Sequence, residues 1–156
     1  MAARVHQINV NPEGGVPKHR VASTRLLREG VEGDKHRDLR FHGGPARAVC
    51  LYSLERLNAL AEEGHPARPG SIGENLTIEG LEWGAVRPGM RFEVGEALIE
   101  ITSETIPCKN IGGSFAGGDF TRVSAKKHPG WSRLYASVLR EGLVREGDPV
   151  HEVHEA

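Results

Sequence analysis

The chain has 156 residues, of which 38% are hydrophobic and 26% charged, an ordinary composition for one globular domain spanning residues 1–156. With 20 Lys and Arg against 21 Asp and Glu, the net charge of −1 gives no electrostatic reason to expect nucleic-acid binding. No apolar run reaches the roughly 18 residues that span a bilayer, and two distant cysteines make no disulfide framework, so we expect a cytoplasmic protein without a membrane or secretory segment.

Glycine and proline recur along the whole chain, which favours short strands joined by turns over long helices. Val5–Val10 predicts a first strand, and the turn Gly14–Lys18 leads into a second. Arg47–Tyr52 predicts a third strand, which its apolar residues mark as buried.

The segment Gly33–Val49 is the most polar part of the chain. Its charged and imidazole side chains precede a glycine turn into the apolar strand: Asp34, Lys35, His36, Arg37, Asp38, Arg40, His42 and Arg47, with Gly43, Gly44 and Pro45 at the turn. Two interpretations stay open: a solvated, salt-bridged loop, or a binding site carried by a rigid strand, where paired glycines let the backbone approach a ligand.

A helix is predicted after the third strand. Ser53 is a suitable N-cap, and one apolar stripe follows before Gly64 ends the helix: Leu54, Leu57, Leu60 and Ala61. Next, Pro69–Leu76 places Glu74 and Asn75 directly before a strand. This segment is either a turn, with glycines at positive φ, or a ligand contact, because the Asn75 amide offers both a donor and an acceptor.

Further strands are predicted at Leu76–Ile78, Met90–Val94 and Ala97–Ser103, of which the last alternates best, and around Val144 and Val150. A second helix is predicted at Trp131–Arg140, where Leu134, Tyr135, Val138 and Leu139 share one helical face. The predicted fold class is a mainly β, single-domain barrel with a few peripheral helices.

Cys108 follows the predicted strand Ala97–Ser103, and Pro107 restricts the backbone before it. The adjacent Lys109 favours a thiolate, which is a nucleophile and a soft metal ligand, whereas the alternative is a small buried apolar residue. Cys50 lies inside an apolar strand, so we interpret it as structural.

A zinc site made from His36, His42, a carboxylate and Cys108 is an alternative that no recognised ligand spacing supports. The glycine pairs Gly112-Gly113 and Gly117-Gly118 match neither a P-loop nor a dinucleotide-binding fingerprint.

Taken together, these motifs resemble the MOSC domain, the C-terminal module of molybdenum-cofactor sulfurases that also occurs as small bacterial proteins. The resemblance runs from about Val5 to Val153 and rests on Gly14-Gly15-Val16-Pro17-Lys18, Gly33-Asp34-Lys35-His36, His42-Gly43-Gly44, Arg47-Ala48-Val49, Tyr52, Gly70, Gly73-Glu74-Asn75-Leu76, Pro107-Cys108, Gly130-Trp131, Val138-Leu139, Gly142 and Gly147-Asp148.

The resemblance implies a barrel of the kind inserted in pyruvate kinase, and a molybdenum–pterin cofactor with Cys108 as metal ligand or sulfur carrier. Relatives of this type reduce N-hydroxylated compounds. On that basis we assign phosphate binding to the guanidinium groups of Arg37, Arg40 and Arg47, and proton donation to His36 and His42. Gly43, Gly44, Glu74, Asn75 and Lys109 complete the expected cofactor contacts.

Two classes of function remain open on the sequence. The first is a molybdenum-dependent reductase acting on a small N-hydroxylated substrate. The second is a sulfur carrier or cofactor-binding module that delivers sulfur through a Cys108 persulfide. The 156 residues hold no aminotransferase-like domain and no iron–sulfur cysteine cluster, so we expect a separate electron-donor or sulfur-donor protein.

Overall fold

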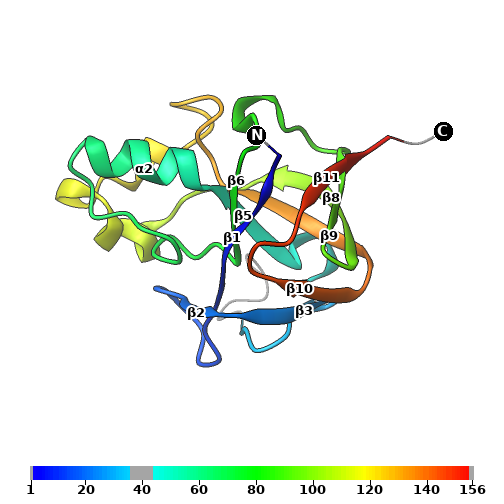
Figure 1. The fold of residues 1–156 in the computed structure, drawn as a ribbon. Coiled ribbons are helices and arrows are strands. Elements are labelled where there is room, and N and C mark those ends of the chain that lie inside the picture. The colour runs from blue at the N-terminus through cyan, green and yellow to red at the C-terminus, as the bar shows by residue number, and fades with distance from the viewer. Residues whose placement is uncertain (1, 36–43, 155–156) are drawn as a thin grey trace.

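Short strands separated by turns build most of the fold, which is mainly β with few helices (Figure 1). The computed structural model describes residues 2–35 and 44–154. In these ranges the strands are β1 (Arg4–Val10), β2 (His19–Val21), β3 (Ser23–Leu27), β4 (Gly30–Val31), β5 (Val49–Ser53), β6 (Leu76–Glu79), β7 (Arg91–Val94), β8 (Ala97–Glu104), β9 (Leu134–Arg140), β10 (Gly142–Arg145) and β11 (Val150–Val153).

Eight of the described strands form one sheet in the order β11-β7-β8-β9-β5-β6-β1-β2, and a second sheet has the order β10-β3-β4. Neighbouring strands are antiparallel except β5 and β6, which are parallel. In Figure 1 the sheet containing β3 and β10 lies at the bottom, and α2 lies at the upper left.

The larger sheet is open, so the predicted closed barrel is not confirmed. The edge strand β11 does approach β1, the second strand from the other edge, since the Val5 amide donates to the Asp148 carbonyl at 2.9 Å and the Val150 amide donates to the Ala3 carbonyl at 3.0 Å. Only an isolated bridge joins Arg4 to Pro149 there. Proline has no N–H to donate, which limits how far a ladder can extend at that point.

The predicted third strand and first helix are both confirmed. β5 is buried along its whole length. It runs directly into α2 (Leu54–Glu62), whose N-cap Ser53 accepts a hydrogen bond from the Arg56 amide at 3.1 Å. Leu57 and Leu60 of the predicted stripe are buried against the core. β5 is therefore a rigid strand on which a site can be built.

The predicted strands at residues 76–78, 90–94 and 97–103 correspond to β6, β7 and β8, and Val144 and Val150 lie in β10 and β11. The alternation predicted for β8 is confirmed, because Ala97, Ile99 and Ile101 are all buried.

The predicted second helix is wrong, because Leu134–Arg140 forms β9. This strand pairs with β5 on one side and β8 on the other, and Leu134, Tyr135 and Ala136 are buried in succession. A strand covered on both faces shows a continuous apolar run, which imitates one helical face over a short window.

Short 3-10 helices carry the connections between strands. They are η1 (Pro45–Arg47), η2 (Trp83–Ala85), η3 (Lys109–Ser114), η4 (Ala116–Gly118) and η5 (Phe120–Val123). Within the described ranges, α2 is the longest helix, and none has the length and apolar character needed to cross a membrane.

Candidate functional site

A cleft lies where the loop before β2, strand β5, the turn before β6, the loop after β8 and the start of β9 meet. We call it the Cys108 cleft. The described residues that line it are Gly15, Val16, Lys18, Lys35, Cys50, Gly73, Asn75, Cys108, Asn110, Ile111, Arg133 and Tyr135.

Cys108 lies in the loop after β8 and directly before η3, where the sequence places it. Its free thiol is half-buried on the wall of the cleft, so it is both accessible and sheltered. Lys109, predicted as a cofactor contact, is exposed and is not among the residues that line the cleft.

Cys50 is the second thiol on the cleft wall. It is only 6% exposed, and its backbone pairs with Asn75. Burial raises the pKa of the Cys50 thiol to about 11, so the group stays protonated at neutral pH. Since the thiolate is the reactive form, Cys50 is a poor nucleophile or metal ligand, and Cys108 is the accessible thiol of the two.

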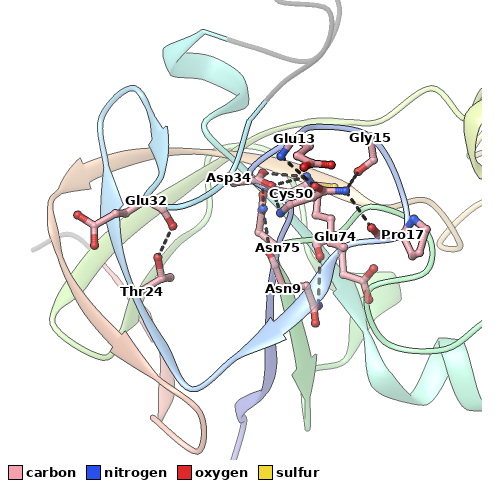
Figure 2. Close-up of polar contacts among 12 residues, drawn as sticks. Asn9, Glu13, Gly15, Pro17, Thr24, Glu32, Asp34, Cys50, Glu74 and Asn75 are labelled. Carbon is pink, nitrogen blue, oxygen red and sulfur yellow. Dashed lines mark hydrogen bonds and ion pairs between the residues drawn. The ribbon is translucent and has the colours of Figure 1, made fainter.

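Asn75 is buried and its side-chain amide is committed to the protein. Its Oδ1 accepts from the Cys50 amide at 3.0 Å, and its Nδ2 donates to the Asn9 carbonyl at 3.2 Å and to Asp34 Oδ2 at 2.8 Å. Figure 2 shows Asp34 and Asn75 pointing toward each other beside Cys50. These contacts fix the turn before β6 against β1 and β5, while a bond from Asn75 to a pterin stays a prediction.

Asp34 connects the start of the polar loop to the cleft. Its carboxylate accepts from the Asn11 amide at 2.7 Å and pairs with Lys18 Nζ at 2.8 Å through both oxygens. The side chains of Lys18 and Asp34 are 9% and 1% exposed, so this is a buried ion pair. Part of the polar segment therefore serves structure.

Glu74 is fully buried and is not among the described residues that line the cleft. Its Oε2 accepts from the Gly70 amide at 3.1 Å and from Thr77 Oγ1 at 2.8 Å, while its Oε1 has no hydrogen-bond partner. Burial raises the pKa of this carboxyl above its ordinary value. These contacts hold the turn that presents Gly73 and Asn75.

The predicted turn is confirmed in its glycines. Gly70 and Gly73 both have φ of +86°. A Cβ at Gly70 would lie 2.5 Å from the Lys18 carbonyl oxygen, so only glycine fits between the two loops.

Sequence reasoning missed Arg133 and Tyr135, because both fall in the region predicted as a helix. Arg133 is 6% exposed, and its Nη1 donates to the Ile72 carbonyl at 3.0 Å. Tyr135 pairs across the strands with Cys50, and burial raises the pKa of its phenol to about 12. The guanidinium of Arg47 lies 5.6 Å from the centre of the Tyr135 ring.

Of the other predicted contacts, Gly44 is exposed with φ of +90° before η1. The remaining five lie outside the described residues: His36, Arg37, Arg40, His42 and Gly43. Within residues 2–35 and 44–154, no group of three or more His, Cys, Asp and Glu side chains could hold a metal ion.

The charged side chains among the described lining residues of the Cys108 cleft are all cationic. Lys18, Lys35 and Arg133 line it, and no carboxylate is found among its described lining residues. Lys18 is neutralised by Asp34, which leaves Arg133 and Lys35 to attract an anion. A soft thiol in a cationic cleft is suited to an anionic ligand that carries a thiophilic metal.

Comparisons with known proteins match the chain to one family. Residues 38–151 match the family model described as MOSC domain. The uncharacterized protein YflK of Bacillus subtilis is 35% identical over 137 residues, which cover 86% of this chain and 61% of YflK. Protein YiiM of Escherichia coli is 32% identical over 156 residues, covering 94% of this chain and 68% of YiiM.

The crystal structure of YiiM from Geobacillus stearothermophilus is similar to this chain with a TM-score of 0.74 and 26% identity, over 97% of this chain and 75% of that one. The chain spans 61% of the length of YflK and 68% of the length of YiiM.

Proposed function

The chain belongs to the MOSC domain family, and from this membership we propose that it binds the molybdenum cofactor in the Cys108 cleft and reduces N-hydroxylated compounds. The family is associated with that cofactor. The observation that carries the proposal is the half-buried Cys108 thiol in a cleft lined by cations and, among the described residues, by no carboxylate.

The described residues fit such a group. The Cys108 thiolate is a soft donor of the kind that binds transition metals. Arg133 has a buried Nε without a hydrogen-bond partner, and Lys35 lines the same cleft, so both are available to an anionic pterin phosphate. The pattern of one accessible thiol and several cations matches the chemistry of this cofactor better than that of a zinc site, which needs more ligands from the protein.

When bound, the cofactor would supply the redox centre that exchanges electrons with the N–O bond. Cys108 would hold the metal from the loop after β8. Cys50, which also lines the cleft, stays protonated because burial raises the pKa of its thiol to about 11, so we do not expect it to hold the metal. His36 and His42 remain our proposed proton donors, and a separate protein would supply the electrons.

Turnover tests the proposal directly. The protein is purified from a host that makes the cofactor, and reduction of an N-hydroxylated purine is followed with an artificial electron donor. We expect turnover in the wild type, its loss in Cys108→Ala, and most of it retained in Cys50→Ala, the matched thiol control.

Two results would contradict the reductase. One is equal turnover in Cys108→Ala and the wild type. The other is cyanide-labile sulfur on Cys108 in protein that carries no molybdenum, which would identify a sulfur carrier instead.

A further inference from the structure

Arg133 is a buried cation whose charge the described residues leave without an ionic partner. Its side chain lines the Cys108 cleft, and the residue is 6% exposed. Its Nη1 donates to the Ile72 carbonyl at 3.0 Å, and its Nε is buried with no hydrogen-bond partner. Buried charges are normally paired, because removing a charge from water is costly unless another charge or hydrogen bonds compensate.

Two other sheltered cations of the described structure, Lys18 and Arg122, do have carboxylate partners. Lys18 pairs with Asp34 at 2.8 Å. Arg122 is 18% exposed in its side chain and binds Glu63 through two hydrogen bonds of 2.8 Å each. Arg133 differs from these two in having no carboxylate partner among the described residues, although it lines the cleft and is almost fully buried.

The nearest candidate for a counter-ion inside the protein is Glu74, and it is a poor one. Glu74 is fully buried, and the Arg133 charge acts on it, but the two side chains form no ion pair. Its Oε2 is occupied by Gly70 and Thr77. Burial raises the pKa of the Glu74 carboxyl, which favours its neutral form, so the charge of Arg133 remains available to a ligand.

The wall of the cleft beside Arg133 is kept open by glycine. Gly73 lines the cleft with φ of +86°. A Cβ there would lie 3.0 Å from Val16 Cγ1 and 3.9 Å from Arg133 Nη1. A side chain at position 73 would therefore fill the space next to the guanidinium, and its absence leaves room for a ligand.

We infer that Arg133 binds an oxyanion of the phosphate-monoester class inside the Cys108 cleft. A guanidinium presents its donors in a planar fork that fits two phosphate oxygens, and the unpartnered Nε supplies one of them. The identity of the ligand rests on the proposed function, under which the anion is the phosphate of the cofactor. The same chemistry would also accept an anionic group on the substrate.

Inorganic phosphate is the probe, titrated by calorimetry at constant ionic strength into protein made without molybdenum. We expect the wild type to bind phosphate and Arg133→Gln to bind at least about tenfold more weakly, since a charge-assisted hydrogen bond is lost. Arg145→Gln is the control, because Arg145 lies in β10, is largely exposed and is outside the cleft lining. It is expected to match the wild type.

Arg133→Gln also breaks the bond to Ile72, so a second measurement avoids dependence on its folding. In the folded wild type, the Nε–Hε signal of Arg133, assigned from the Arg133→Lys spectrum, is expected to shift as phosphate is added. Phosphate binding that leaves this signal unmoved, or that is equal in Arg133→Gln and the wild type, would overturn the inference.

The molybdenum and pterin content of the purified protein separates this inference from the proposed function. Phosphate binding that needs Arg133, in a protein that never carries molybdenum, supports the anion site while the cofactor proposal fails. If the wild type does carry the cofactor, a lower pterin content in Arg133→Gln than in the wild type identifies the cofactor phosphate as the anion. Full pterin content with a higher KM for an anionic substrate identifies the substrate instead.

Discussion

Removing the carboxylate charge of Asp34 is expected to destabilise the fold strongly. In Asp34→Asn, the buried Lys18 ammonium loses the counter-ion that contacts it at 2.8 Å through both oxygens. An NH2 group replaces one of the two carboxylate oxygens, and it cannot accept the hydrogen bond that Asn75 Nδ2 donates to Asp34 Oδ2 at 2.8 Å. The remaining oxygen can still accept from the Asn11 amide, so part of the network survives.

Breaking a buried ion pair by removing one partner costs about 3–5 kcal/mol, because the other charge is left uncompensated. With Lys18 and Asp34 at 9% and 1% side-chain exposure, this range applies here. We expect the free energy of unfolding, measured by urea denaturation, to fall by about that amount. Adding Lys18→Met should recover part of the loss, since the double variant has no unpaired buried charge.

Glu146→Gln is the control for this measurement. It breaks an ion pair with Arg20 whose side chain is 66% exposed, so the expected loss is within about 1 kcal/mol. A loss below about 1 kcal/mol for Asp34→Asn, or no recovery in the double variant, would refute the reasoning that this buried ion pair stabilises the fold.

Three further predictions concern the burial of Cys50 and Glu74 and the tight packing around Gly70. Iodoacetamide at pH 8 should modify Cys108 in the folded protein and Cys50 only on unfolding, because burial raises the Cys50 pKa to about 11; mass spectrometry showing equal labelling would contradict this. Burial also raises the folded-state pKa of Glu74, so ionisation of this carboxyl destabilises the fold as the pH rises above the ordinary pKa of a glutamate. Glu74→Gln should therefore raise the melting temperature more at pH 8 than at pH 4.5, and an equal shift at both pH values would count against this prediction. Gly70→Ala should lower the free energy of unfolding by more than backbone strain alone, which costs about 1–3 kcal/mol, because the new Cβ would lie 2.5 Å from a carbonyl oxygen. Gly147→Ala is the control, since Gly147 has φ of +88° but no atom within 4 Å of the added Cβ, so this variant should show the strain alone. Equal losses for the two variants in urea denaturation would exclude the clash.

Local sequence patterns were sufficient for the elements that position Cys108. Ser53 and the leucines after it predict α2 because capping and a helical stripe are properties of adjacent residues. The alternation of Ala97, Ile99 and Ile101 predicts β8, and the position of Cys108 after that strand follows directly. The error at β9 has the opposite origin, since only pairing with β5 and β8 shows that its apolar run is a strand.

The polar contacts of the site could not be predicted, because they join residues far apart in the chain. Asp34 and Asn75 look like possible ligands in sequence, whereas the structure pairs them across 41 positions. Arg133 carries no local signal at all. Only the structure shows that its side chain lines the cleft and that its Nε is buried without a hydrogen-bond partner.

X-ray absorption at the molybdenum edge tests the central claim most directly. Wild-type protein, Cys108→Ala and Cys50→Ala are purified from one host that makes the cofactor, and the sulfur ligands around molybdenum are compared. The account predicts that Cys108→Ala either holds no molybdenum or shows one sulfur ligand fewer, while Cys50→Ala matches the wild type. Equal molybdenum content and identical sulfur coordination in all three would contradict it.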